Sequence, residues 1–234
     1  MKKLFTAIRH ADIEEVKSIL EKNPEAVNSI AETTPKKDHG QSPLQISLKI
    51  GQIEIADYLI DHGANVNFCE AEDDDPGLRA PVIFDAITAT IDSLCYKKFE
   101  VSDRALLTLE KMINKGADVN SFTSHGWGTV NWAIFRAQQI ILHPDSYIES
   151  QNEVRKKLAG ILDLLIKNNV DLNAWANRGF YPEPNPGPAS KTILLDPEDP
   201  QNSLNLEKIK PLREFIQEYF NRKNISFNEK IQIS

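Results

Sequence analysis

The sequence has few cysteines, and none of them lies in a metal-binding pattern. Cys69 and Cys95 are the only two among 234 residues. Two thiols are too few for a disulfide framework or for the full ligand shell of a zinc ion, so we predict that both are reduced and incidental. No two histidines have the His-x-x-x-His spacing of a metal site, and no Cys-x-x-Cys pair occurs. We therefore expect no metal and no cofactor.

Long hydrophobic runs are also missing. No stretch approaches the roughly 20 apolar residues that a membrane-spanning helix needs. The first residues, with Lys2 and Lys3 before a short apolar stretch, resemble the basic start of a signal peptide, but Arg9 ends this stretch too early for a secretory core. We predict a cytoplasmic protein that does not bind membranes.

An excess of positive charge is lacking. The chain has 27 lysines and arginines against 34 acidic residues, a formal net charge of −7. A general nucleic-acid-binding protein would carry a basic stripe that displaces counterions from phosphates, so we expect no nucleic-acid partner. An acidic field does speed encounters with a basic protein surface, although the same charge also serves solubility alone.

Catalytic motifs are absent too. The sequence contains no glycine-rich phosphate loop and no Gly-x-Ser-x-Gly turn. Asp85, Asp92 and Asp103 are lone carboxylates, which are usually solvated on helix surfaces. We expect no enzyme, and a hydrolase with an unfamiliar site is the remaining alternative.

What the sequence does contain is a recurrence. Asn67, Asn120 and Asn173 close three similar segments and are separated by 53 positions each (67 to 120 and 120 to 173). In each segment an apolar helical pattern ends at a residue suited to a positive φ: Gly63, Gly116 and Asn169. This order predicts a helix, a left-handed turn and a polar corner, three times over.

Each ending follows two apolar segments. The segments directly before the endings have helical spacing over residues 53–60, 106–113 and 158–166. Upstream of them lie residues 43–48, 81–87 and 129–134, and Pro43 and Pro81 occupy positions that a first helical turn tolerates. The repeated unit is therefore predicted to be helix, turn, helix and a polar loop, which we call a finger.

Residues 39–67 resemble the ankyrin repeat. His39-Gly40-Gln41-Ser42-Pro43-Leu44-Gln45 is similar to the family's glycine-x-threonine-proline-leucine-histidine start, and His62-Gly63-Ala64-Asn65-Val66-Asn67 is similar to its end. Ser42 stands at the usual threonine position and Gln45 at the usual histidine position, so both hydrogen-bonding sites are changed but stay polar. Residues 80–120 and 127–173 match at their ends and poorly in the middle.

The resemblance implies an all-α, ankyrin-like solenoid of helix-turn-helix repeats with short finger loops. We predict one repeat domain over residues 1–234. Its parts are repeats at 1–28, 38–67, 79–120 and 126–173, a proline-rich connector at 181–200 and a helical cap at 203–224. Terminal units are expected to be atypical because their outer faces meet water.

The internal repeats are longer than the family's roughly 33 residues. The excess lies in an enlarged finger over 68–77 and in additions at 94–102 and 143–153 that lengthen the helices. Inserted segments in repeat proteins often lie on a binding face, and neutral drift of surface loops is the alternative. Three insertions in one short solenoid favour a specialised binder.

The enlarged finger carries an acidic cluster: Glu70, Glu72, Asp73, Asp74 and Asp75. One interpretation is a docking patch for a basic partner. A second is calcium binding, but the spacing lacks the alternation and distal glutamate of an EF-hand loop. A third is a solvated loop with no partner.

Aromatic residues supply the other candidates. Trp127 follows His125 in a predicted finger, and Trp175 lies close to Arg178, Phe180 and Tyr181 after the third corner. Aromatic and arginine side chains on exposed loops are typical interface anchors, so we predict partner contacts here, with internal packing as the alternative. Trp132 falls on an apolar helix position and is predicted to be core.

The proline-rich residues 181–188 cannot form a helix, and they are interpreted as a spacer or, alternatively, as a ligand for an aromatic groove. Taken together, the sequence predicts a monomeric, non-catalytic module that binds a basic protein. The resemblance extends to compact, acidic ankyrin-like immunity proteins, which implies an inhibitor of a partner such as a toxin. The alternative is an adaptor or effector scaffold that bridges several proteins.

Overall fold

The protein folds into a row of stacked helix pairs. The computed structural model describes residues 2–32, 38–71, 78–142, 148–172 and 206–225, and over these ranges every regular element is a helix. One isolated β-bridge, between Phe122 and Gly128, is the sole strand-like pairing in the described part of the chain. The predicted all-α class is confirmed.

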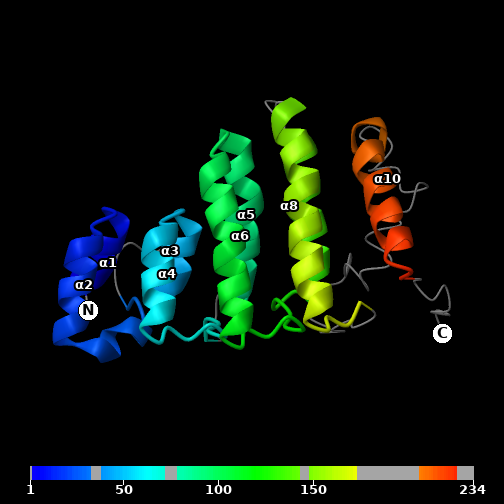
Figure 1. The fold of residues 1–234 in the computed structure, drawn as a ribbon. Helices are drawn as coiled ribbons and strands as arrows, with labels where there is room; N and C mark the ends of the chain where they lie inside the picture. Colours follow the sequence, from blue (N-terminus) through cyan, green and yellow to red (C-terminus); the bar gives the residue numbers. More distant parts are fainter. Residues whose placement is uncertain (1, 33–37, 72–77, 143–147, 173–205, 226–234) are drawn as a thin grey trace.

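Four helix pairs follow one another along the chain (Figure 1). They are α1 (Lys2–Arg9) with α2 (Ile13–Lys22), α3 (Pro43–Lys49) with α4 (Ile53–Asp61), α5 (Ile83–Asp92) with α6 (Phe99–Asn114), and α7 (Thr129–Leu142) with α8 (Ile148–Lys167). Two 3₁₀ helices, η1 (Pro24–Asn28) and η3 (Ser93–Tyr96), and the last helix, α10 (Leu206–Arg222), complete the described elements.

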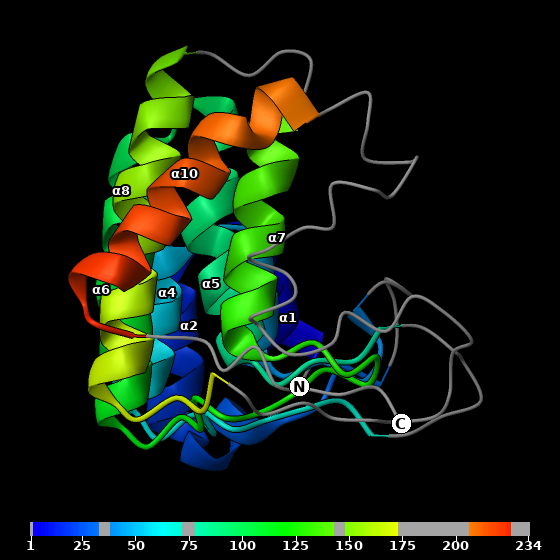
Figure 2. The same ribbon diagram turned by 90° about the vertical axis from the view of Figure 1, so that its right-hand side faces the viewer.

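The helices form two layers. The first helices of the pairs (α1, α3, α5 and α7) contact one another in sequence order, and so do the second helices (α2, α4, α6 and α8). Figure 2 looks along the stack and shows the fingers extending to the same side as the first helices. We call the first helices inner and the second helices outer.

The start of α3 shows how the sequence fixes an inner helix. Ser42 is the N-cap, its hydroxyl accepts a hydrogen bond from the Gln45 backbone N–H at 3.2 Å, and the Gln45 side chain accepts one from the Ser42 backbone N–H at 3.4 Å. This capping box satisfies two backbone donors that would otherwise have no partner. Pro43 occupies the first turn, where its missing N–H costs nothing.

The predicted left-handed corners are confirmed. Gly63, Gly116 and Asn169 have φ of +89°, +93° and +62°. At each corner the next residue donates its N–H to a carbonyl five residues back: Ala64 to Leu59, Ala117 to Met112 and Val170 to Leu165, at 2.9, 2.9 and 3.1 Å. The same backbone bond thus ends α4, α6 and α8.

Asparagine side chains join successive corners. Asn67 donates to the Gly116 carbonyl at 2.9 Å and accepts from the Asp118 N–H at 2.8 Å. Asn28 bonds in the same way to Gly63 and Asn65, and Asn120 to Asn169 and Asp171. Each of these asparagines therefore holds the corner of the following unit, and the recurrence in the sequence has a direct structural cause.

Much of the extra length of the later repeats lies in longer helices. The outer helices α2 and α4 have 10 and 9 residues, whereas α6 and α8 have 16 and 20. In Figure 1 the added turns of α5, α6 and α8 project away from the corners and fingers. Residues 94–102 form most of η3 and the start of α6, so this insertion is not an open binding loop; residues 143–147 lie outside the described residues.

Polar contacts fasten the added turns to one another. The Ser102 hydroxyl donates to the Thr90 carbonyl at 2.6 Å and joins α6 to α5. The Ser150 hydroxyl donates to the Leu94 carbonyl at 2.9 Å and joins α8 to η3. Because both hydroxyls are buried, each bond satisfies groups that would otherwise lose their water.

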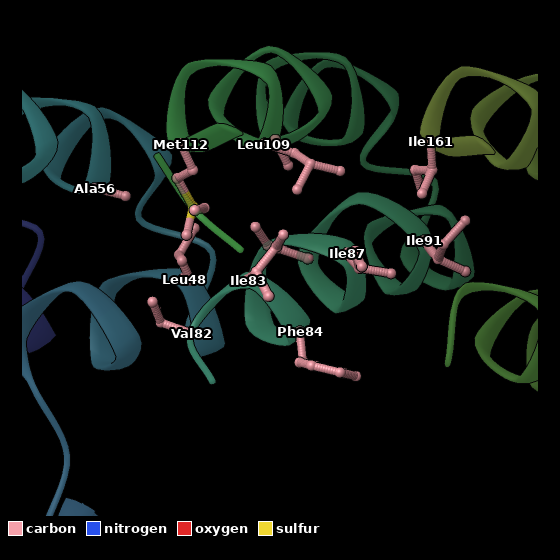
Figure 3. Packing of buried hydrophobic residues seen from close by; sticks show 14 of the residues in the cluster. Leu48, Ala56, Val82, Ile83, Phe84, Ile87, Ile91, Leu109, Met112 and Ile161 are labelled. Atoms are coloured by element: carbon pink, nitrogen blue, oxygen red, sulfur yellow. The ribbon is translucent and has the colours of Figure 1, made fainter. Parts of the chain in front are cut away.

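One apolar core runs between the two layers through all the units. Figure 3 shows its middle, where Ile83 and Ile87 of α5 lie near Leu109 and Met112 of α6. All four are fully buried, with Ile83 at 1% exposed and the other three at 0%. Continuous burial from unit to unit is what makes a stack of short helices stable.

The last helix resembles the outer helices. Leu212, Ile216, Tyr219 and Phe220 of α10 are buried, and α10 packs on α7 and α8. Asn224 has a φ of +54°, and Ile225 donates its N–H to the Phe220 carbonyl at 3.1 Å, which is the bond that ends α4, α6 and α8. The predicted helical cap thus ends in the repeat's own corner geometry.

Candidate partner-binding surface

The inner face combines the accessible sides of the inner helices with the fingers. We define the second finger as residues 68–71 and 78–81, and the third finger as residues 121–128. Ser124 of the third finger donates its N–H to the Arg79 carbonyl at 2.8 Å, and its hydroxyl accepts from the Arg79 N–H at 3.0 Å. These two bonds hold neighbouring fingers side by side.

The third finger is a short hairpin. The Thr123 N–H donates to the Trp127 carbonyl at 2.9 Å, and the Thr123 hydroxyl accepts from the Trp127 N–H at 3.1 Å. Gly126 has a φ of +82°, which reverses the chain at the tip. His125 is half-buried at this tip, and Trp127 is directed back toward α7.

Four aromatic rings gather where this finger meets the inner helices. We call Phe84, Trp127, Trp132 and Phe135 the aromatic cluster. The Trp127 ring centroid lies 5.0 Å from that of Phe135 and 6.2 Å from that of Trp132, and Trp132 lies 6.0 Å from Phe84 in an edge-on arrangement. Phe84 is buried, whereas the other three remain partly exposed.

Polar contacts orient this cluster. The Trp132 indole N–H donates to the Thr88 hydroxyl at 2.9 Å, so the ring edge is fixed against α5. One turn later, Arg136 pairs with Asp92 through two hydrogen bonds and lies 5.9 Å from the Trp132 ring. Burial raises the pKa of Asp92, and the hydrogen bonds and charge of Arg136 oppose that rise. The rings are thus held in place before any partner arrives.

A second group of side chains lies nearer the N-terminal end of the inner face. Lys49 of α3 places its ammonium 3.3 Å from Glu70 Oε1 of the second finger and 4.0 Å from Asp85 Oδ1 of α5. Gln45 donates to Asp85 Oδ2 at 3.4 Å. We call Lys49, Glu70 and Asp85 the Lys49 cluster, in which one ammonium faces two carboxylates.

The environment of Asp85 is unusual for a carboxylate. It is 9% exposed, and its burial raises the pKa to about 7, with Glu70 adding to the rise and Lys49 and Gln45 opposing it. Glu70 Oε2 is buried and accepts no hydrogen bond from the described residues. The Lys49 cluster is therefore short of donors.

The structure places only part of the predicted site. Glu70 lies against the inner helices instead of extending into solvent, Trp127 is half-buried on α7, and His125 stands at the tip of the third finger. Trp132, predicted to be core, packs on the core but keeps a partly exposed edge. Outside the described residues lie the other acidic and aromatic candidates, together with the proline-rich connector: Glu72, Asp73, Asp74, Asp75, Trp175, Arg178, Phe180, Tyr181 and residues 181–200.

The comparison with protein families agrees with this geometry. The family model of the ankyrin repeat matches residues 39–71, which span the turn before α3, the helices α3 and α4, and the start of the second finger. The chain carries an ankyrin repeat. None of the curated proteins matches the chain. Together with the helix pairs, the match gives an ankyrin-like helical repeat fold, in which the ankyrin repeat of α3 and α4 contributes Gln45, Lys49 and Glu70 to the inner face.

A metal site or a membrane-spanning helix would indicate a different function. Among the described residues, no three histidine, cysteine, aspartate or glutamate side chains gather as ligands of a metal ion. In the same part of the chain, no helix is both long and apolar enough to span a bilayer. Asp103, one of the lone carboxylates in the sequence, pairs with Lys157 of α8.

Sequence reasoning missed the partners of the Lys49 cluster. The signal that was available is Asp85 itself, which interrupts the apolar run Val82-Ile83-Phe84 and Ala86-Ile87. A charged residue inside such a run is rarely buried without a partner. Nothing in the spacing of the sequence indicates that Asp85 lies near Lys49 of α3 and Glu70 of the second finger.

Proposed function

We propose that the protein binds a protein partner through its inner face, with the aromatic cluster as the anchor. An ankyrin repeat is typical of protein–protein interaction modules, and the single observation that supports this placement is the partly exposed group Trp127, Trp132 and Phe135. On the outer helices α2, α4, α6 and α8, the ring contact between described residues is the stacked pair Tyr58 and His62, and the most exposed large apolar side chain is Leu107, at 64%. Clustered aromatic rings are enriched at binding hot spots, whereas single exposed leucines are ordinary.

The hydrogen-bonded setting of the cluster supports tight binding. Trp132 is bonded to Thr88, and Arg136 is paired with Asp92 beside it, so few side chains need to be ordered on association. Each rotamer-rich side chain that is already fixed avoids roughly 0.5–1.5 kcal/mol of ordering cost. This argument favours a partner that docks onto a preformed surface.

We further propose that the partner is basic and that binding inhibits it. The net charge of −7 and the acidic residues 70 and 72–75 of the enlarged finger support this choice, because an acidic field accelerates the approach of a positive surface. The protein is proposed to act as a cytoplasmic monomer, as a small immunity-type inhibitor would. The second candidate, a scaffold for several proteins, is distinguished by the experiment below.

The test is affinity capture from the source cell with three forms of the protein: the unchanged chain, the double variant Trp127→Ala/Phe135→Ala, and Leu107→Ala as the matched control on the outer layer. We expect one dominant basic protein with the unchanged chain and the control, and its loss with the double variant, provided that thermal melts show all three to be folded. Several proteins at similar levels would favour the scaffold. Equal capture by all three forms would contradict a role for the aromatic cluster.

A further inference from the structure

The Lys49 cluster joins three separate elements. Lys49 belongs to α3, Asp85 to α5 and Glu70 to the second finger. Glu70 is thus the member of the cluster that contacts the Lys49 ammonium from a loop and not from a helix. The finger has a second attachment nearby, because Val82, just before α5, donates its N–H to the Phe68 carbonyl at 2.8 Å. The first part of the second finger, residues 68–71, is therefore held by this small ionic group and one backbone bond, whereas Arg79 and Ala80 of its second part are bonded to Ser124 and Gln45.

The charge that Glu70 meets depends on Asp85. When Asp85 is protonated, the Glu70 carboxylate faces a net positive charge from Lys49. When Asp85 is ionised, the ammonium is shared between two carboxylates, and the net charge facing Glu70 is close to zero. Because the Glu70 and Asp85 side chains are only 13% and 12% exposed, the repulsion between the two carboxylates is weakly screened, although the Lys49 side chain is 38% exposed.

We propose that the Lys49 cluster is a pH-sensitive contact that holds residues 68–71 of the second finger against α3 and α5 in mildly acidic solution and releases them as the pH rises. Glu70 is the group that moves, since it lies on a loop, whereas Lys49 and Asp85 are fixed on helices that pack on each other. The raised pKa of Asp85, about 7, sets the range in which the change takes place.

Other charged groups around Asp85 do not replace this contact. Within the described residues, the groups that act on Asp85 are Lys49 and Gln45 from α3 and Glu70 from the finger. On α7, Arg136 pairs with Asp92, two turns further along α5. On α6, Lys111 bonds to Asp61 and Asp103 pairs with Lys157, both in the outer layer.

The test is hydrogen exchange of single backbone amides in the free protein, measured by NMR from pH 6 to pH 8 and corrected for the intrinsic effect of pH. The Val82 amide reports release of the finger, and the Leu162 amide, in the buried part of α8, reports opening of the whole fold. We expect protection of Val82 to fall about tenfold over this range, the factor that corresponds to one pKa unit of coupling.

Two variants separate the finger from the rest of the molecule. Glu70→Gln removes the repulsion, so Val82 should lose the pH dependence that exceeds that of Leu162, while Leu162 keeps the smaller pH dependence that the burial of Asp85 causes. Asp85→Asn should remove the pH dependence of both amides, and Asp92→Asn, on the same helix, should leave that of Val82 as it is. Protection of Val82 that does not vary with pH, or that varies equally in Glu70→Gln, would overturn the proposal. Because no partner is used, this result is independent of the proposed function.

Discussion

At the scale of single residues, Asp85 is the most informative side chain. It is 9% exposed, and its only cation among the described residues lies 4.0 Å away, so the structure favours its neutral form. A native carboxyl whose pKa is about 7, against an ordinary value of 3.8, binds a proton that the unfolded chain has already lost. Between these two values the fold must therefore lose stability as the pH rises.

The first prediction concerns this loss. The free energy of unfolding should decrease from pH 4 to pH 7 by at most ~1.4 kcal/mol per pH unit from this group, and then level off. Asp85→Asn should flatten the profile and be more stable than the unchanged chain at pH 8. Urea unfolding at a series of pH values measures this dependence.

Asp92→Asn is the contrasting variant: it removes the negative partner of Arg136 and should lower the free energy of unfolding at both ends of the pH range. Parallel profiles for the unchanged chain and Asp85→Asn would show that Asp85 titrates normally.

The second prediction concerns the asparagines that join the corners. Asn67→Ala removes a donor to Gly116 and an acceptor for Asp118, and since the site is exposed, water replaces part of both bonds. We expect a loss of about 1–2 kcal/mol in the free energy of unfolding, from two bonds of roughly 0.5–1.5 kcal/mol each. Lys115→Ala, at the exposed C-cap of the same corner, is the control and should change little. An equal effect of the two substitutions would argue against a structural role for Asn67.

Local backbone chemistry explains which residues the sequence predicts well. Gly63, Gly116 and Asn169 are recognisable because few residues tolerate a positive φ, and all three adopt it. The role of Asn28 was not predicted, because Asn28 is the last residue of a 3₁₀ helix and does not follow a glycine corner. Glu70 was expected in an exposed acidic finger, but its contact with Lys49 spans 21 positions, and spacing alone does not reveal such a pair.

At the scale of elements, the amphipathic pattern of the sequence predicts where the helices lie, and the contacts between helices show which of them are inner and which are outer. The pattern of α10 indicates a terminal helix, as found. Its likeness to α8 is visible in the sequence, where Asn224-Ile225 parallels Asn169-Val170, and in the shared corner bond. Tyr219 of α10 also donates to Asp163 of α8 at 2.6 Å, and Lys223 pairs with the same carboxylate.

The third prediction tests the docking of α10. Ile216 is 2% exposed on the face of α10 that packs on α7 and α8, so Ile216→Ala should cost about 2–5 kcal/mol through lost burial and a cavity. The neighbouring Gln217→Ala, on the exposed face, should change stability by less than about 0.5 kcal/mol. Thermal or urea unfolding of the two variants compares them directly. If Ile216→Ala matched Gln217→Ala, α10 would not be part of the cooperative fold.

At the scale of the whole molecule, the repeats keep their corners in register while their helices lengthen. The added turns of α5 to α8 project away from the fingers, so the growth of the later repeats does not cover the inner face (Figures 1 and 2). The family resemblance of residues 39–67 and the 53-residue recurrence were sufficient to predict this architecture. They did not reveal the aromatic cluster, because Trp127, Trp132 and Phe135 come together only when a finger folds back on α7.

The central claim is that the inner face receives a protein partner, and site-specific photo-crosslinking tests it most directly. A photoreactive amino acid at Gln139, exposed on α7 one turn beyond Phe135, should form a covalent bond to the captured partner. The same amino acid at Leu107, exposed on the outer layer, should form none or far less. Efficient crosslinking from Leu107 with none from Gln139 would place the partner on the outer layer and contradict the account.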